Sequence, residues 1–200
     1  MKNSKNTNKR TASGISLYVI LAILVFSIAF GIIFDVISRK AEHHVYPRKY
    51  SEHVIKYAED FGVPESIVYA VIKTESDFDR NAVSSADTPA IGLMQLTEET
   101  YDWVATKLKE SPSAFAIYDP ETNIRYGVWY LSYLYGRFEN WDTAFAAYNA
   151  GPGNVSKWLK DPEYSDDGET LKYIPFKETR NYVKKVNDAK AEYESLYYSE

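Results

Sequence analysis

Apolar residues form one unbroken block near the start of the chain. No charged residue occurs from Thr11 to Phe34, and residues 15–34 are almost entirely apolar. A helix of about 20 residues spans the roughly 30 Å hydrocarbon core of a bilayer. A cleaved secretory signal would have a shorter apolar stretch ending in a small-residue cleavage site, which this block lacks. The pattern therefore predicts a membrane anchor over residues 15–37, in preference to a cleaved signal or a buried helix.

Positive charges are more numerous before this block than after it. The basic residues that precede it are Lys2, Lys5, Lys9 and Arg10. Arg39 and Lys40 follow it, accompanied by the acidic Asp35. An excess of positive charge marks the cytoplasmic side of a membrane segment. We therefore expect residues 1–14 to be a basic cytoplasmic tail and the chain beyond the anchor to lie outside the plasma membrane.

Residues 38–50 are polar and are interrupted by Pro47, which favours a tether. Fully extended, this segment would reach roughly 40–45 Å, so we expect the substrate near the outer membrane face. Residues 51–200 carry 15 Lys and Arg against 26 Asp and Glu, a net charge of −11. This charge disfavours contact between the exported part and anionic lipid.

Beyond residue 50, apolar residues recur at helical spacing, and strand-like alternation is hard to find. Capping residues, prolines and glycines mark the predicted ends of the helices. These boundaries lie at Phe61, Pro64, Thr97, Asp119, Arg137, Asp142, Gly151, Leu159, Pro175 and Leu196. We expect residues 51–200 to form one all-α domain, large enough to bury a core without disulfides.

Composition removes several kinds of chemistry. The chain has no cysteine, which excludes disulfides, thiolate metal sites and cysteine nucleophiles. All three histidines lie within the first 53 residues, which argues against a Ser-His-Asp triad or a histidine zinc site in the main domain. A net charge of −5 disfavours nucleic acid as a partner. We therefore expect no nucleic acid partner, no metal and no cofactor.

Glu75 is the first candidate for chemistry. It follows an apolar helix and precedes Ser76, close to where that helix should end. A half-buried carboxyl there would have a raised pKa, as a general acid near neutral pH requires. An arbitrary glutamate in such a place is more often a solvated helix end, so the other motifs decide its meaning.

Three further motifs follow Glu75-Ser76 along the chain. Gly92-Leu93-Met94-Gln95 is an apolar turn with an amide, and Ala147-Tyr148-Asn149-Ala150-Gly151 joins a phenol and an amide to a glycine. Glu178 and Tyr182 are spaced i and i+4, which places them on one side of a helix. Each motif alone has an ordinary structural explanation.

In this order, the four motifs resemble those of the lytic murein transglycosylases of the soluble type, which have the goose-type lysozyme fold. The resemblance covers about residues 51–195. It implies an all-α, lysozyme-like catalytic domain that cleaves the β-1,4 bond between N-acetylmuramic acid and N-acetylglucosamine in peptidoglycan. The family does so without consuming water and leaves a 1,6-anhydro ring on the muramic acid.

The resemblance also implies roles for single residues. Glu75 would protonate the leaving oxygen and then, as a carboxylate, take the proton of the muramoyl 6-hydroxyl. The substrate-binding residues that it implies are Ser84, Met94, Gln95, Tyr148, Asn149, Glu178 and Tyr182. Of these, Met94 and Gln95 are expected along the sugar groove and Tyr148 near the catalytic carboxyl. Asn149 is expected to fix the turn that follows Tyr148. We expect most of the four tryptophans in the core, with one or two stacking on sugars.

One segment departs from the family pattern. Where members have a short loop around Gly-Ala, residues 84–91 form a longer stretch that contains Asp87 and Pro89. Asp79 or Asp87 could then position a water, which would make the protein a hydrolytic muramidase. A non-catalytic glycan-binding scaffold is a second alternative.

Overall fold

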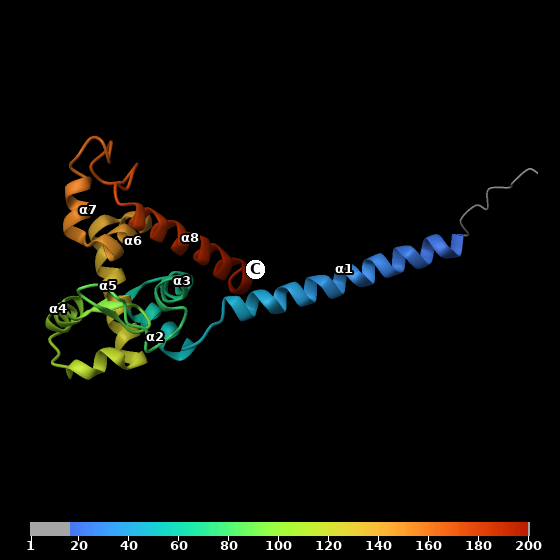
Figure 1. Ribbon diagram of the computed structural model, residues 1–200, viewed down its shortest axis with the longest axis horizontal. Helices are drawn as coiled ribbons and strands as arrows, with labels where there is room; N and C mark the ends of the chain where they lie inside the picture. Colours follow the sequence, from blue (N-terminus) through green and yellow to red (C-terminus); the bar gives the residue numbers. More distant parts are fainter. Residues whose placement is uncertain (1–16, 200) are drawn as a thin grey trace, which may run out of the picture. The chain divides into compact units, whose positions relative to one another are not determined.

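The computed structural model describes residues 17–199, which divide into two compact units between Val45 and Tyr46. The described part of the first unit is one long helix, and the second unit is a helical domain (Figure 1). The basic tail that we expected over residues 1–14 lies outside the described residues, as do the first residues of the expected anchor.

Helix α1 (Leu17–Val45) makes up the described part of the first unit. Its stretch Tyr18–Val45 is long and apolar enough, by length and composition, to cross a membrane. The helix ends eight residues beyond the expected anchor, at Val45. No glycine or proline occurs between Gly31 and Pro47, so nothing in this stretch breaks the helix. The helix ends just before Pro47, because the residue before a proline disfavours helical geometry. The first part of the expected tether is therefore helical.

Within residues 46–199, the second unit contains seven α-helices, one 3₁₀ helix and one short hairpin. They are α2 (Ser51–Phe61), α3 (Glu65–Ser76), β1 (Ala90–Ile91), β2 (Leu96–Thr97), α4 (Glu98–Leu108), η1 (Ala114–Tyr118), α5 (Pro120–Phe138), α6 (Trp141–Ala150), α7 (Pro152–Trp158) and α8 (Lys177–Tyr197). The predicted helices are all present and their ends agree closely with the prediction, which confirms the all-α class.

Side-chain caps fix the starts of two of these helices. Thr97 accepts a hydrogen bond from the backbone nitrogen of Thr100 at 3.2 Å, which caps α4. Asp119 accepts one from the backbone nitrogen of Thr122 at 2.9 Å, which caps α5. Each cap satisfies a backbone donor that the helix itself leaves free. Both capping residues are those that the sequence predicts.

The antiparallel hairpin of β1 and β2 is not predicted by the sequence. Ala90 pairs with Thr97, and Ile91 pairs with Leu96. Strands of two residues are too short to produce an alternating pattern of apolar and polar positions. The hairpin matters because its turn is the Gly92-Leu93-Met94-Gln95 motif.

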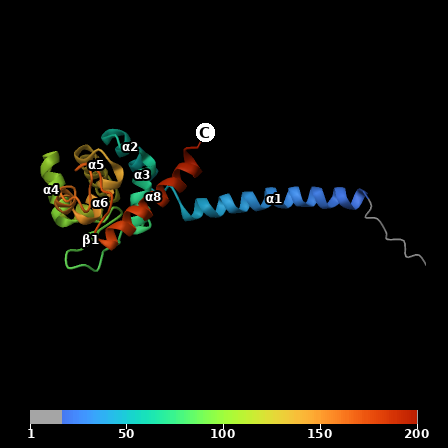
Figure 2. The same ribbon diagram turned by 90° about the horizontal axis from the view of Figure 1, so that it is seen from above.

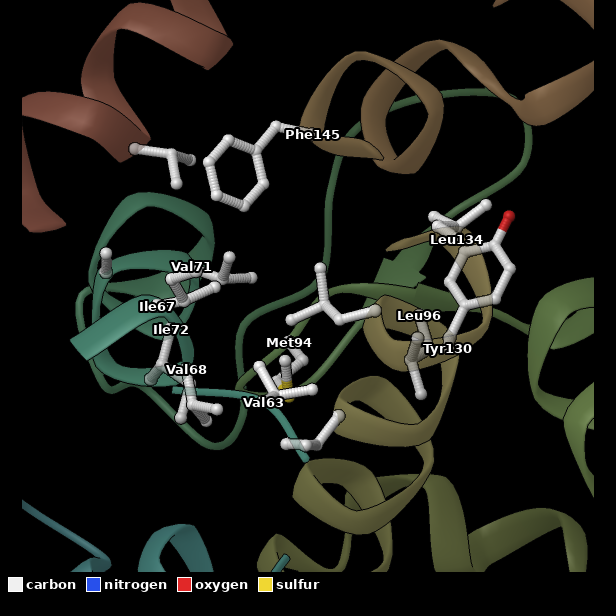
Figure 3. Close-up of a cluster of buried hydrophobic side chains, with 14 of the residues drawn as sticks. Val63, Ile67, Val68, Val71, Ile72, Met94, Leu96, Tyr130, Leu134 and Phe145 are labelled. Carbon is white, nitrogen blue, oxygen red and sulfur yellow. The ribbon is translucent and has the colours of Figure 1, made fainter. Parts of the chain in front are cut away.

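Helix α3 lies at the centre of the domain. Its residues from Ile67 to Ile72 are all fully buried. Helix α8 runs alongside α3 in both views (Figures 1 and 2). Apolar side chains of α3, the hairpin, α5 and α6 meet in one core (Figure 3). Since full burial of each large aliphatic side chain contributes about 1.5–3 kcal/mol, α3 is a rigid support for the residues at its end.

Residues 46–50 pack against the domain. The hydroxyl of Tyr197 donates a hydrogen bond to the backbone oxygen of Tyr46 at 2.8 Å. The hydroxyl of Tyr193 donates one to the backbone oxygen of Pro47 at 3.1 Å. Both tyrosines belong to α8, so the first residues of the domain are fixed to its last helix.

Arg48 joins this segment to α3 as well as to α8. Its guanidinium forms an ion pair with Glu65, at an N–O distance of 3.3 Å. The same group lies 5.3–5.7 Å from the ring centroids of Tyr69, Tyr197 and Tyr198, within cation–π range. The structure therefore differs from the tether expected over residues 38–50, since its first part is helical and its last five residues are fixed to the domain.

Candidate active site

Glu75 lies in the last turn of α3, directly beyond the buried part of that helix. The chain then turns sharply, because Asp77 and Phe78 both adopt left-handed backbone geometry, with φ of 50° and 66°. Such geometry is strained for residues other than glycine and persists only where the surrounding packing holds it. Phe78 is 4% exposed, so its side chain is held in the core. The turn leaves Glu75 at the end of a rigid helix.

Protein atoms crowd the Glu75 carboxyl, although the residue stays partly open to solvent. Burial raises the pKa of Glu75 to about 7, because the ionised form loses water, and the nearby Tyr182 hydroxyl opposes part of this rise. Among the described residues, no charged side chain contributes to the shift. Glu75 is therefore close to half protonated at neutral pH, which suits a group that both gives and takes a proton.

Tyr182 on α8 supplies the hydroxyl that acts on the pKa of Glu75. It is 7% exposed, and burial followed by the Glu75 charge raises the pKa of Tyr182 well above its usual value. Within residues 17–199 its hydroxyl forms no hydrogen bond of standard geometry. A buried hydroxyl without any partner is costly, and the Glu75 carboxyl is the group near enough to accept a hydrogen bond from it. Glu178, one turn earlier, is exposed in the first turn of α8.

Tyr148 on α6 is the second tyrosine close to Glu75. Burial, followed by the Glu75 charge, raises the pKa of Tyr148 well above its usual value. The phenol therefore stays protonated, and its hydroxyl donates a hydrogen bond to the backbone oxygen of Met94 at 2.7 Å. This bond joins α6 to the hairpin turn, and with the closeness of Tyr148 to Glu75 it brings three of the four sequence motifs together.

The hairpin turn is also fixed by a hydrogen bond from α3 and by hydrogen bonds from its own residue Gln95. The Ser76 hydroxyl donates to the backbone oxygen of Leu93 at 2.8 Å. The Gln95 amide nitrogen donates to the backbone oxygens of Gly92 at 2.9 Å and of Ala82 at 3.1 Å. Gln95 has a left-handed φ of 48°, and these bonds hold that geometry. Its amide oxygen has no hydrogen bond within residues 17–199 and is the part of Gln95 that a ligand can use.

Asn123 supports the candidate site from within the fold, and the sequence analysis missed it. It is fully buried in the first turns of α5. Its Oδ1 accepts a hydrogen bond from the backbone nitrogen of Met94 at 2.8 Å, and its Nδ2 donates to the backbone oxygens of Ile91 at 3.0 Å and Ile117 at 2.9 Å. A Cβ built on Gly92 would lie 2.5 Å from the same amide, so glycine is required there. Asn123 thus positions the turn that accepts the Tyr148 hydrogen bond.

Three other expected site residues make contacts within the fold. The Ser84 hydroxyl accepts a hydrogen bond from the backbone nitrogen of Ala90 at 2.9 Å and closes the loop between them. The Asn149 side-chain oxygen accepts one from the Thr179 hydroxyl at 2.8 Å, which links α6 to α8. Met94 is fully buried, so its side chain lies in the core and not along a groove as expected.

The two aspartates that a hydrolytic mechanism would need are both exposed. Asp79 accepts a hydrogen bond from the backbone nitrogen of Asn81 at 2.9 Å, and Asp87 lies in the loop after Ser84. Neither contributes to the pKa of Glu75. In the part of the chain that the structure describes, no group of three or more His, Cys, Asp or Glu side chains could hold a metal ion.

The arrangement suits proton transfer. One carboxyl with a pKa near 7 lies close to two neutral phenols, beside a turn fixed by buried hydrogen bonds. Residues 52–171 of the chain match the Transglycosylase SLT domain. The chain belongs to this family. The SLT match covers the helices that carry Glu75 and Tyr148, and Tyr182 lies beyond its end.

Named relatives of this SLT chain include soluble and membrane-bound proteins. It is 37% identical over 147 residues to the soluble lytic murein transglycosylase of Escherichia coli strain K12, a match that covers 70% of this chain and 22% of that protein. It is 31% identical over 194 residues to the membrane-bound lytic murein transglycosylase C of Edwardsiella ictaluri, covering 82% of this chain and 52% of the relative. The chain therefore matches between about a fifth and a half of the length of these relatives.

Solved structures agree with this assignment. The chain is similar to the lytic transglycosylase Slt of Pseudomonas aeruginosa, solved as an inactive mutant, with a TM-score of 0.66 and 35% identity over 75% of this chain and 24% of that one. It is also similar to the 70 kDa soluble lytic transglycosylase of Escherichia coli, with a TM-score of 0.68 and 31% identity over 78% of this chain and 25% of that one. The SLT domain here thus has the lysozyme-like fold that the resemblance implies.

Proposed function

We propose that the chain is a membrane-anchored lytic murein transglycosylase that cleaves the bond between N-acetylmuramic acid and N-acetylglucosamine, with Glu75 as the catalytic residue. The single observation that carries this proposal is the Glu75 carboxyl, whose pKa of about 7 arises from burial and not from a neighbouring carboxylate. The names of the SLT relatives support the reaction class.

The reaction has two proton transfers and needs one carboxyl. Protonated Glu75 gives its proton to the glycosidic oxygen as the bond to C1 of the muramic acid breaks. The resulting carboxylate then takes the proton of the muramoyl 6-hydroxyl while that oxygen forms a bond to C1. The product is a 1,6-anhydro ring, no water is consumed, and Glu75 is protonated again. The 2-acetamido group of the sugar can stabilise the positive charge that develops at C1.

Most glycosidases use two carboxylates, because one of them must activate water or form a covalent intermediate. Here the nucleophile is part of the sugar, so a second carboxylate is dispensable. We assign Tyr182 and Tyr148 to orienting the sugar and the acid, and the Gln95 amide oxygen to a sugar N–H or hydroxyl group. Ser84 and Asn149 support the site through the fold, and we assign Glu178, exposed one turn before Tyr182, to a contact with the glycan strand.

A hydrolytic muramidase would need Asp79 or Asp87 close to Glu75, and neither affects the Glu75 pKa. A non-catalytic scaffold would have no need of a half-buried carboxyl with a raised pKa. No observation favours either alternative.

The test is mass spectrometry of fragments that the full chain releases from purified peptidoglycan. We expect products lighter by one water than those of a muramidase, and none from Glu75→Gln. Hydrated reducing ends from the wild type would reject the transglycosylase reaction. Wild-type products that persist in Glu75→Gln would reject Glu75 as the catalytic residue.

We also propose that the chain crosses the plasma membrane once, through residues 15–37, with its N-terminus in the cytoplasm and its catalytic domain outside. The apolar helix Tyr18–Val45 and the membrane-bound relative support an anchor. The basic residues that precede the apolar block support the orientation.

The absence of cysteine from the sequence allows a direct test of this topology. Single variants Ser4→Cys and Ser199→Cys are treated in intact cells with a maleimide that does not cross membranes. We expect labelling of Ser199→Cys alone, with both variants labelled after lysis. Labelling of Ser4→Cys in intact cells would reverse the proposed orientation.

A further inference from the structure

Thr179 is a buried polar residue in the first turn of α8 that has no role in the chemistry proposed above. It is 1% exposed, whereas Lys177 and Glu178 before it are exposed. Its hydroxyl donates a hydrogen bond to the side-chain oxygen of Asn149 at 2.8 Å, in the last turn of α6. Thr179 lies outside the set of residues that we expected to bind substrate.

The first turn of α8 depends on this hydrogen bond, because little else holds the turn in place. Phe176, which precedes the helix, supplies no side-chain cap. Arg180 donates hydrogen bonds to the backbone oxygens of Ile174 and Pro175, which belong to the loop before the helix. Among residues 177–182 as the structure describes them, Thr179 alone forms a side-chain hydrogen bond of standard geometry to another helix. Helix ends fray when their backbone donors lack partners, so this contact fixes where α8 begins.

Both ends of the hydrogen bond lie next to a tyrosine of the candidate site. Thr179 and Tyr182 are spaced i and i+3 on α8, and both are buried, so they share the inner face of the helix. Asn149 directly follows Tyr148, whose hydroxyl is bonded to the hairpin turn. The charge of Glu75 raises the pKa of both phenols, so both lie close to its carboxyl. The bond therefore fixes the two tyrosines relative to each other and to Glu75.

The helices that this bond joins also supply the titratable groups that face Glu75. These groups are Tyr182 from α8 and Tyr148 from α6. The turn of residues 92–95 contains no titratable side chain, and among the described residues no charged side chain shifts the pKa of Glu75. Burial is the main cause that raises this pKa to about 7. If the start of α8 moved outward, water would reach the carboxyl and its pKa would fall toward the usual value.

We propose that Thr179 is a positioning residue for the proposed reaction, since its hydrogen bond to Asn149 holds Tyr182 beside Glu75 and keeps water from the carboxyl. The inference rests on the proposed function, because it adds a residue to the same site. Thr179 is buried, so it acts through these other residues and does not contact the sugar.

The test compares Thr179→Val, which keeps the shape of the side chain but lacks the hydroxyl, with Thr179→Ser, which keeps the hydroxyl. Initial rates of cleavage of soluble glycan strands by the full chain in detergent, measured across pH, give kcat, KM and the alkaline limb of kcat/KM. We expect Thr179→Val to lower kcat about tenfold with little change in KM, and to move the limb down by about one pH unit. Thr179→Ser should retain the wild-type values.

Asn149→Ala removes the same hydrogen bond from an exposed position, so it tests the proposal even if Thr179→Val folds poorly. It should move the limb by a similar amount, and the double variant should move it no further. Thr143→Val is the matched control, because Thr143 is 1% exposed and its hydroxyl bonds to the Asn140 side-chain oxygen at 3.1 Å, at the other end of α6. We expect this control to lower stability and to leave the limb unchanged.

An alkaline limb that stays at its wild-type pH in Thr179→Val or in Asn149→Ala would overturn the proposal. A Thr179→Ser protein as impaired as Thr179→Val would also overturn it, because the hydroxyl would then be irrelevant. A carbon-13 NMR titration of the Glu75 carboxyl, identified as the signal missing from Glu75→Gln, measures the same shift without any reaction. A shift in that titration together with hydrated products from the wild type would reject the proposed function but support the positioning of Glu75 by Thr179.

Discussion

The pH dependence of the proposed activity should follow the protonation state of Glu75, and the surroundings of Glu75 set the pH at which that state changes. Burial raises the Glu75 pKa to about 7, and the first proton transfer of the proposed reaction needs the protonated form. We therefore expect kcat/KM to fall as the pH rises through about 7. Measurement of the initial rate of fragment release across this range checks it, and an alkaline limb near pH 4.5 would show that the carboxyl is not desolvated.

The same burial predicts how Glu75→Gln changes stability. The carboxyl ionises near pH 4.5 in the unfolded chain but near pH 7 in the folded one, so its contribution to stability is lost as the pH rises through this window. Glutamine cannot ionise. We expect Glu75→Gln to be more stable than the wild type at pH 8, by at most about 3 kcal/mol, and nearly equal to it at pH 4. Urea unfolding at both pH values measures the difference, which should vanish if the carboxyl is well hydrated.

Asn123 should matter to the stability of the fold. Asn123→Ala removes hydrogen bonds to three backbone groups in the core, at Ile91, Met94 and Ile117. Leaving such groups unsatisfied should lower the free energy of unfolding by about 3 kcal/mol. Thermal unfolding measures this loss. Asn181→Ala, at an exposed position on α8, is the control and should change stability by less than about 0.5 kcal/mol.

For single residues, the sequence predicts the raised pKa of Glu75 better than it predicts which side chains are buried. A glutamate after an apolar helix indicates a half-buried carboxyl, and the raised pKa of Glu75 is confirmed. The burial of Asn123 and Met94 was missed, because both depend on how the hairpin turn packs against α5, a contact between segments that are distant in the chain.

Helix α5 contains two glycines that should respond oppositely to the same substitution. A Cβ on Gly127 would lie 2.3 Å from the Met94 sulfur and 2.8 Å from its Cβ, whereas a Cβ on Gly136 meets nothing within 4 Å. We expect Gly127→Ala to destabilise the domain by about 1–3 kcal/mol through overpacking. Gly136→Ala should stabilise it by about 0.5 kcal/mol, because alanine loses less backbone entropy in a helix.

Urea unfolding of both variants checks this pair. Equal effects would mean that the turn containing Met94 moves away from α5 at little cost. Glycerol-free buffer and one protein concentration keep the two curves comparable.

Helices were more predictable than the short elements between them. Caps at Thr97 and Asp119 and the break before Pro64 are local signals, so the helices that they start could be located from sequence. The two-residue strands and η1 have no period of their own, and tertiary packing determines them. Helix α1 extends past the expected anchor because the polar residues after it still favour helix.

For the whole molecule, residues 46–50 should behave as part of the domain. We compare proteins that begin at Tyr46 and at Ser51, since Tyr46–Glu200 is a compact unit. Removing the segment deletes the Arg48 ion pair, its tyrosine contacts and two hydrogen bonds. These interactions together contribute about 2–4 kcal/mol, so we expect a melting temperature about 5–10 °C lower.

Arg48→Ala in the longer protein should reproduce part of that loss. Circular dichroism melting curves of the three proteins measure it. Identical midpoints would mean that the segment is a tether after all and contributes no stability.

The hydrogen bond between Tyr197 and Tyr46 brings the first and last residues of the helical domain together. A domain whose ends meet can be joined to other sequence at a single point without disturbing its interior, as circular permutation and domain insertion exploit. Because its two ends lie close together, this domain can be inserted into a longer protein as one unit. The region that matches the soluble lytic murein transglycosylase of Escherichia coli strain K12 makes up 22% of that protein, so a similar unit occurs there joined to much more sequence.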